Sequence, residues 1–375
     1  LLRMKRNENF QAGRANRYST RDRSSRDVYG NTKPAAALTR APLRDVGRTN
    51  TAVKQIPRGH ARPITKPQDR IFSMLGLRGP IPNYDDVNQY DPLRKAEYAR
   101  DIFSCMLDKE ESHILSERFV EDCRGISSKE RSTLLNWLVA LHTRLAIPTE
   151  SLWLMVSYLD HYIARKGSIR PEHLLHTGVA CLLLADKWEQ QRPGILDEVI
   201  PTLKASSDSF RTPCRCRQGP PRLDRGHKVP FCGKCTSRVV EAIERNVWEV
   251  MGHDMNVPTA VVFMRRYAVV GEVSDLVRYT GFYLSELCFQ EPALAKYRPS
   301  RLAAACLSLA QSVHGKAAWS ETMQYYSGYT ASEISDLVQT IRPVLAKVQH
   351  TAKKSYAKYA GERYYRLAHQ MMDLL

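Results

Sequence analysis

No apolar stretch in this 375-residue chain approaches the roughly 20 residues that a helix needs to cross a bilayer. No basic segment followed by an apolar core opens the sequence either, so we predict a soluble intracellular protein with no membrane partner. The sequence starts at Leu1 and not at a methionine, which leaves the position of the true N-terminus open.

Catalytic and disulfide patterns are missing as well. We find no nucleophile with a matched base, no phosphate loop and no HExxH motif, and the 11 histidines are scattered. The nine cysteines have no spacing typical of a disulfide framework, and those in helical patterns are expected to be reduced. The residues therefore give no sign of an enzyme, and we expect no cofactor.

The net charge of +17 is concentrated in two places. Residues 1–70 hold 17 Lys/Arg against 5 Asp/Glu, residues 211–235 hold 7 against 1, and the rest of the chain is close to neutral. A nucleic-acid reader would carry its basic surface on the folded body. We therefore expect no specific nucleic-acid partner, and we predict that residues 1–90 are a disordered basic tail.

Residues 131–190 have the period of three helices. Apolar side chains recur every three or four residues from Leu134 to Leu145 and again from Leu152 to Ile163, and Pro148, Thr149 and Gly167 interrupt the pattern. A third segment begins near Pro171 and is apolar all round from Val179 to Ala185, which predicts a central, buried helix. ACLLLA at 180–185 recurs as ACLSLA at 305–310, so we predict a second, duplicated helical unit.

Three blocks of this region resemble the cyclin box: ERSTLLNWL at 130–138, ESLWLMVSYLDHYI at 150–163 and HLLHTGVACLLLADKWEQ at 173–190. The likeness continues upstream in EYARDIF at 97–103 and downstream in PTAVVFMRRY at 258–267. It implies an all-α fold of two tandem five-helix cyclin boxes. The expected order is a tail at 1–90, an N-terminal box at 91–256 with an insertion at 211–235, and a C-terminal domain at 257–375.

The resemblance is to mitotic cyclins of the A and B types, and it implies a non-catalytic subunit that binds and activates a cyclin-dependent protein kinase, with a role at G2/M. Such a protein is expected in nucleus and cytoplasm. By position, Lys187 and Glu244 match the charged pair with which cyclins hold their kinase, and we expect both to face solvent in the free chain. Arg131 and Asp160 match an internal pair that ties two helices together.

Two further family motifs are present in altered form. RAPLRDVGRTN at 40–50 resembles the destruction box read by the ubiquitin-ligase degradation machinery, with Arg40, Leu43 and Asp45 in place. In the patch that docks substrate peptides, Leu134 and Trp137 remain, whereas the family residues at 130, 133 and 140 are replaced by Glu, Thr and Ala. These departures indicate a divergent mitotic cyclin.

The insertion at 211–235 allows two interpretations. Its C-x-C and C-x-x-C pairs supply enough thiolates for one tetrahedral zinc, from Cys214, Cys216, Cys232 and Cys235. The segment lacks an apolar period and interrupts a familiar helical unit, so we favour a retained intron or another in-frame insertion that binds no metal. An alternative function is a cyclin-fold transcription factor whose zinc element binds promoter DNA. The nearly neutral body argues against it.

Overall fold

The structure is a computed structural model, and it describes residues 84–87, 96–190, 195–206, 233–316 and 319–371. Contacts divide the chain into two compact units, residues 1–61 and 62–375, and every described residue lies in the second unit. Some predicted site residues fall outside the described ranges, namely Arg40, Leu43, Asp45, Cys214, Cys216 and Cys232.

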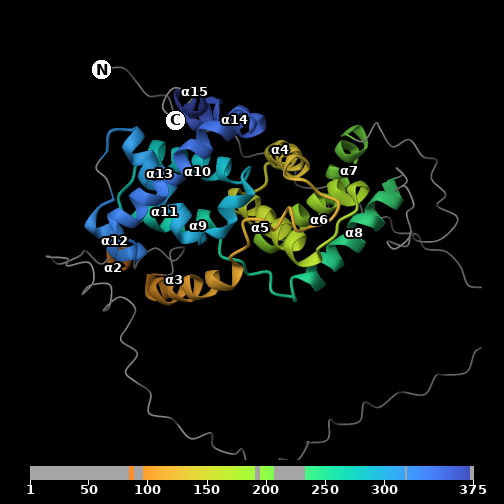
Figure 1. The fold of residues 1–375 in the computed structure, drawn as a ribbon, viewed down its shortest axis with the longest axis horizontal. Helices are drawn as coiled ribbons and strands as arrows, with labels where there is room; N and C mark the ends of the chain where they lie inside the picture. Colours follow the sequence, from red (N-terminus) through yellow and green to blue (C-terminus); the bar gives the residue numbers. More distant parts are fainter. Residues whose placement is uncertain (1–83, 88–95, 191–194, 207–232, 317–318, 372–375) are drawn as a thin grey trace, which may run out of the picture. The chain divides into compact units, whose positions relative to one another are not determined.

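Five helices form the first repeat: α4 (Ser128–Arg144), α5 (Thr149–Lys166), α6 (Pro171–Glu189), α7 (Ile195–Ser206) and α8 (Gly233–Val250). Helix α6 packs against α4, α5 and α8 (Figure 1), and its residues from Val179 to Ala185 are buried. A helix that is apolar all round needs neighbours on all sides to exclude water. The prediction that this is a central helix is confirmed.

Local signals set where these helices begin and end. Ser127 caps α4 in a capping box, in which its side chain accepts from the Glu130 N–H and the Glu130 carboxylate accepts from Ser127. Pro148 stands at the N-cap of α5, and Gly167 ends that helix at φ +66°, a backbone conformation that glycine adopts without strain. The breaks predicted at Pro148 and Gly167 are confirmed.

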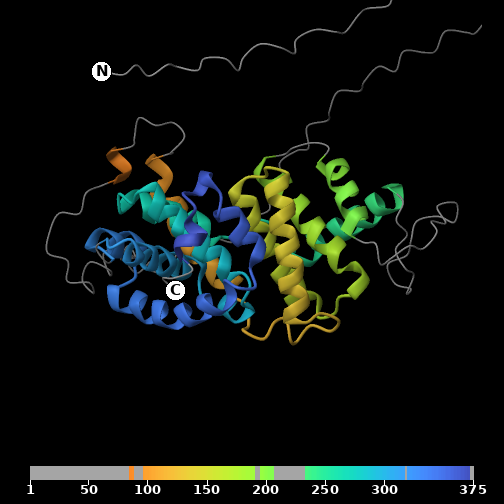
Figure 2. The ribbon, with the colours of Figure 1, turned by 90° about the horizontal axis from the view of Figure 1, so that it is seen from above.

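The second repeat has the same plan. It contains α9 (Ala260–Val270), α10 (Asp275–Cys288), α11 (Pro299–Val313), α12 (Glu321–Ser327) and α13 (Ala331–Val348), with the short η3 (Pro292–Lys296) before α11. Helix α11 carries ACLSLA and packs against α9, α10 and α13, so it takes the place that α6 has in the first repeat. Figure 2 shows the first repeat, yellow to green, beside the second, cyan to blue.

Short elements flank the two repeats. Helices α2 (Tyr84–Val87) and α3 (Ala96–Glu110) and the turn η1 (Glu111–His113) precede α4. Helices α14 (Lys353–Tyr359) and α15 (Leu367–Met371), with η4 (Glu362–Tyr364) between them, follow α13. Helix α14 packs against α4 and α10, so the end of the chain contacts both repeats. The all-α prediction is confirmed for the described residues, which contain no strand and only one isolated β-bridge.

Some boundaries differ from the sequence prediction. Residues 84–87, assigned to the tail, form helix α2, because contacts with the second repeat stabilise a segment that has no apolar period of its own. Helix α8 begins at Gly233, inside the predicted insertion, and ends at Val250. Helix α7 was not predicted, although Ile195, Val199 and Leu203 recur at helical spacing and are buried. Within the described ranges, no helix is long and apolar enough to cross a membrane.

Candidate functional site

Lys187 and Glu244 lie on adjacent helices of the first repeat. Lys187 stands in the last turn of α6, and Glu244 lies in the middle of α8, which packs against α6. The Lys187 Nζ is 2.8 Å from both carboxylate oxygens of Glu244. The Lys187 side chain is 52% exposed and that of Glu244 only 10%. The expectation that both side chains face solvent is therefore wrong for Glu244, because α6 covers it.

Burial and pairing act on the Glu244 carboxyl in opposite directions. Burial raises its pKa above the usual range, and the hydrogen bond and charge of Lys187 partly reverse that effect. A carboxylate in this position depends on its ammonium partner, because an unpaired buried charge is costly. The pair is therefore assembled in the free chain before any partner arrives.

Two tryptophans flank this pair. Trp188 follows Lys187 at the end of α6 and is 48% exposed, and Trp248, one turn after Glu244 on α8, is 38% exposed. Large exposed aromatic side chains beside a buried charge are typical of interfaces and are enriched among their energetic centres. Neither tryptophan was predicted from the sequence as a site residue, although each lies within one helical turn of Lys187 or Glu244. We call Lys187, Trp188, Glu244 and Trp248 the α6/α8 face.

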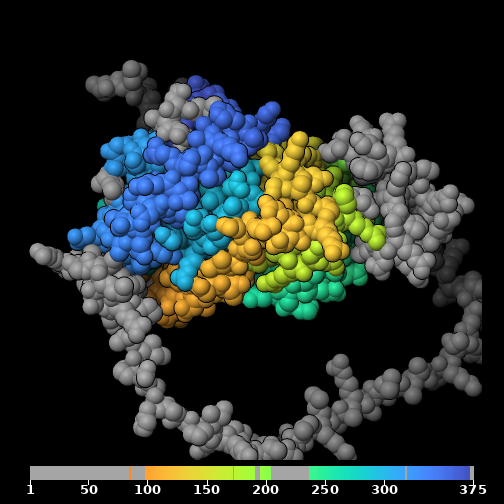
Figure 3. All heavy atoms as spheres, in the orientation of Figure 1, coloured from red at the N-terminus to blue at the C-terminus, as the bar shows by residue number. Residues whose placement is uncertain are grey.

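Helix α3 presents a second apolar surface. Tyr98 is 55% exposed and Ile102 is 45% exposed, whereas Met106 and Leu107 are partly buried and pack against the core. The buried side of the helix carries Ala99, Phe103 and Glu110. Figure 3 shows α3 in orange and α8 in green along the lower edge of the described body.

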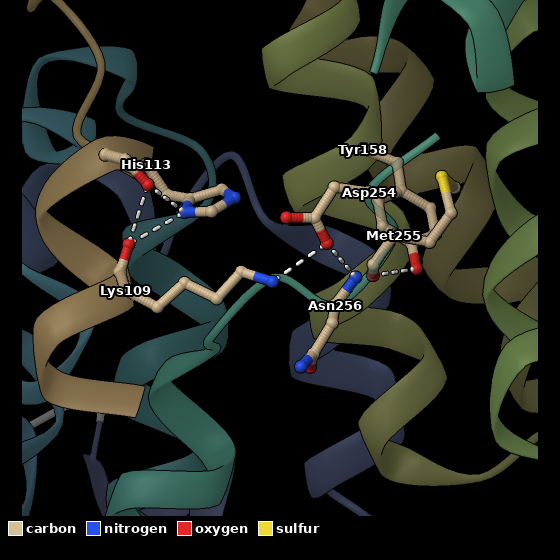
Figure 4. Close-up of polar contacts among 7 residues, drawn as sticks. Lys109, His113, Tyr158, Asp254, Met255 and Asn256 are labelled. Carbon is tan, nitrogen blue, oxygen red and sulfur yellow. Dashed lines mark hydrogen bonds and ion pairs between the residues drawn. The ribbon is translucent and has the colours of Figure 1, made fainter. Parts of the chain in front are cut away.

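The end of α3 is joined to the segment between the two repeats (Figure 4). The Lys109 Nζ lies 2.8 Å from the Asp254 carboxylate, which also accepts a hydrogen bond from the Asn256 N–H. Nearby, the Tyr158 hydroxyl of α5 donates to the Met255 carbonyl oxygen at 2.6 Å. The segment between the repeats is thus held by α5 on one side and by α3 on the other.

Arg131 and Asp160 form a buried pair between α4 and α5. The arginine donates through Nε and Nη2 to the two carboxylate oxygens at 2.7 and 2.6 Å, and through Nη1 to the Phe289 carbonyl oxygen at 2.6 Å. Burial raises the pKa of Asp160, and the charge of Arg131 opposes the shift. Since Phe289 follows α10, this arginine also ties the first repeat to the second, which the sequence did not predict.

Leu134 and Trp137 lie in one apolar groove between α4 and the start of α6. Pro171, Leu174 and Leu175 line its other side, and Lys129, Glu130 and Thr133 lie at its rim. The Glu130 carboxylate is engaged with Ser127 at the helix cap, which lowers its pKa. The groove keeps an apolar lining although the family residues at 130, 133 and 140 are replaced.

Most of the predicted degron and zinc residues lie outside the described ranges. Arg40, Leu43 and Asp45 lie outside the described residues, and of the four cysteines only Cys235 falls in a described helix, with its side chain outside the description. Among the described side chains, no group of three or more His, Cys, Asp or Glu residues is placed to hold a metal ion.

Comparison with known proteins gives two family matches. Residues 101–256 match the model of the cyclin N-terminal domain, and residues 258–372 match that of the cyclin C-terminal domain. A viral cyclin from herpesvirus saimiri has a similar fold, with a TM-score of 0.50 and 15% sequence identity over 69% of this chain and 99% of its own.

Curated relatives are mitotic cyclins at low identity. The chain is 28% identical to the G2/mitotic-specific cyclin-B3 of Gallus gallus over 71% of its own length and 59% of the relative's length. It is 25% identical to the G2/mitotic-specific cyclin-B2 of Homo sapiens over 88% of its own length and 80% of that protein. The chain thus spans less than two thirds of the chicken protein.

Proposed function

Because this chain belongs to the cyclin family, whose two domain models together match residues 101–256 and 258–372, we propose that it binds and activates a cyclin-dependent protein kinase. Cyclins are regulatory subunits and have no catalytic activity of their own, so the chemistry resides in the partner. The α6/α8 face is the observation that supports this proposal best, since it combines a preassembled charged pair with two exposed tryptophans.

The mechanism is a population shift in the kinase. A protein kinase is active only when a lysine on a strand pairs with a glutamate on a mobile helix. A subunit that binds the active placement of that helix more tightly than the inactive one shifts the equilibrium toward it. The α6/α8 face suits this role, because Lys187 and Glu244 present charge-assisted hydrogen-bonding groups while Trp188 and Trp248 supply apolar area. Tyr98 and Ile102 of α3 supply further exposed apolar area for such a partner.

The phase of action proposed is G2/M. Its support is that several relatives with this domain pair are G2/mitotic-specific cyclins, at about a quarter of positions identical. A protein acting at that transition would be found in nucleus and cytoplasm and would be removed by ubiquitin-dependent degradation at mitotic exit.

Arg40 and Leu43 provide the test of regulated degradation. Changing both to alanine is expected to prolong the half-life of the chain at mitotic exit by removing the motif that the ligase would bind, with no change in melting temperature. Half-life is measured after release of a synchronised culture. Equal turnover of variant and wild type would refute the degron assignment.

The kinase proposal is tested with the double variant K187A/E244A. Loss of a charge-assisted contact at an interface costs roughly 2–5 kcal/mol when its partner is left buried, and about 3 kcal/mol is more than a hundredfold in affinity. We expect the double variant to lose copurification with its kinase and the associated activity. Both residues must be changed together. K187A alone leaves the Glu244 carboxylate buried without an ammonium and is expected to lower the melting temperature.

A matched control is the exposed ion pair between Lys296 of η3 and Glu117, whose side chains are 44% and 52% exposed and belong to neither α6 nor α8. K296A/E117A removes the same two charges and should retain kinase binding, because exposed pairs contribute little to stability. Wild-type binding by K187A/E244A would show that this face is not the kinase surface.

A further inference from the structure

Helix α3 precedes the first repeat in sequence, yet its inward side contacts the second repeat. The Phe103 ring packs on Phe263 of α9 with centroids 6.3 Å apart. The Glu110 carboxylate accepts hydrogen bonds from the N–H and hydroxyl of Ser300 at the start of α11, at 2.9 and 2.6 Å. The orientation of α3 is therefore set by the second repeat.

Arg266 of α9 is the residue where this docking converges. Its guanidinium is bidentate to Asp85 of α2, with Nη2 to Oδ2 at 2.6 Å and Nη1 to Oδ1 also in contact. Its Cζ atom lies 5.0 Å from the ring centroid of Phe103 on α3 and 5.0 Å from that of Tyr326 on α12. One side chain thus contacts three other helices.

The chemistry of this junction requires an arginine. The side chains of Arg266 and Asp85 are only 13% and 12% exposed, so water screens their interaction weakly. A planar guanidinium can bind a carboxylate through two parallel N–H groups and stack on aromatic rings at the same time, which a lysine ammonium cannot do. R266K would therefore keep the charge and lose the geometry.

The anchored and exposed residues of α3 are neighbours on one helix. Phe103, which Arg266 covers, follows directly after Ile102, whose side chain is 45% exposed. Consecutive residues of an α-helix point about 100° apart, so the contact that fixes Phe103 also fixes the direction of Ile102 and, one turn earlier, of Tyr98.

We propose that Arg266 is a positioning residue for the kinase surface: from the second repeat it holds α3 so that Tyr98 and Ile102 face the kinase bound at the α6/α8 face. This inference rests on the proposed function. It makes the second repeat a determinant of kinase affinity although its own helices supply none of the residues proposed to contact the kinase.

The anchoring step is tested in the free chain by backbone hydrogen exchange. R266M is expected to speed exchange of the α3 amides by about tenfold, since a desolvated cation–π contact and a bidentate pair are lost together, while the α11 amides keep their protection. R266K should resemble R266M, and R366M, which removes the exposed arginine paired with Glu362, should leave α3 unchanged. Unchanged α3 exchange in R266M would overturn the proposal.

The positioning step is tested by kinase affinity in double-mutant cycles. R266M is expected to weaken binding about tenfold in the wild-type background and in W248A, but by less than about twofold in Y98A/I102A, because the surface that it positions is already gone. A loss of equal size in all three backgrounds would show that Arg266 does not act through α3 and would overturn the proposal. A wild-type chain that binds no kinase would overturn the proposed function, and the exchange experiment would still decide the anchoring.

Discussion

Two ion pairs between buried side chains join helices of this protein. Lys358 of α14 contacts Glu286 of α10 at 2.6 Å, with side chains 5% and 0% exposed, and Arg131 contacts Asp160 in the same way. Such pairs stabilise little relative to apolar residues of the same volume, but loss of one partner leaves a buried charge and costs roughly 3–5 kcal/mol. The loss of stability measured for a single substitution at these positions therefore includes the cost of the unpaired buried charge as well as the loss of the contact.

Two buried histidines make the stability of the fold depend on pH. Burial, with the charge of Lys358 as a smaller cause, lowers the pKa of His142 to about 4, and burial also lowers that of His161 to about 4. Each ring lies within hydrogen-bond distance of a backbone carbonyl oxygen, at Pro148 and Ser157 respectively. Both rings are neutral in the folded chain above pH 6.5, the ordinary histidine pKa.

We predict that acid destabilises the fold through these histidines. As the pH falls from 6.5 toward 4, the unfolded chain binds protons and the folded chain does not, so stability present above pH 6.5 is lost. At about pH 5 the loss is about 2 kcal/mol per histidine. The measurement is the urea midpoint between about pH 7 and 5, which should fall less in H142Q/H161Q than in wild type.

Comparing wild type with H142Q/H161Q separates the effect of the two histidines from that of other titrating groups. Burial raises the pKa values of Glu110 and Glu244, and these carboxyls act with the opposite sign in the same range, but they are present in both proteins. H369Q, which changes an exposed histidine, serves as control and should follow wild type. Parallel midpoints for wild type and H142Q/H161Q would contradict the assignment.

At the scale of elements, the close approach of α6 to α4 depends on Gly178. A Cβ atom at this position would lie 2.9 Å from a Leu138 methyl and 3.0 Å from a Leu134 methyl, and both leucines are buried. Glycine in a helix usually costs up to about 1 kcal/mol relative to alanine. Because Gly178 has no side chain, α6 can pack closely against α4. This close packing explains why the central helix tolerates a glycine.

We predict that G178A destabilises the protein, against the usual effect of this substitution in helices. Overpacking of a filled core costs about 1–3 kcal/mol, which exceeds the gain in helix propensity. Thermal unfolding of G178A should therefore begin at a lower temperature. G361A is the matched control, because its backbone φ is −73° and a Cβ there meets only a carbonyl oxygen at 3.6 Å. A melting temperature raised by G178A would show that α4 and α6 can separate without cost.

At the scale of the whole molecule, the described parts of both repeats share one hydrophobic core. Polar contacts cross between them as well: the Trp153 indole of α5 donates to the Ser285 hydroxyl of α10 at 3.0 Å, and Arg131 donates to the Phe289 carbonyl oxygen. Neither repeat can unfold without exposing apolar surface and orphaned polar groups of the other.

We therefore predict a single cooperative unfolding transition for the two repeats. Trp319 is the one tryptophan of the chain that lies in the second repeat, so the difference in fluorescence between wild type and W319F reports on that repeat. This signal should change at the same urea concentration as the helical circular dichroism. Two separated midpoints would show that the repeats are independent domains.

Local signals account for the parts of the fold that the sequence predicted. Helical period, Pro148 and Gly167 predict the course of α4 to α6, and the echo of ACLLLA in ACLSLA predicts a second central helix. These features act over one or two turns of chain, so they can be read without knowing which residues meet. Helix α7 carried the same signal and was overlooked, whereas the short α2 had none.

Among candidate site residues, the sequence determined identity and the tertiary structure determined arrangement. The blocks that resemble cyclins contain Lys187, Arg131 and Asp160, and Glu244 was selected by its position in the same resemblance, because a family motif is a property of the chain itself. Only the folded chain decided that Glu244 is buried under its lysine and that α3 turns Tyr98 outward while it docks on Arg266 of the distant repeat. Burial and pairing depend on which surfaces, far apart in sequence, exclude water from each other.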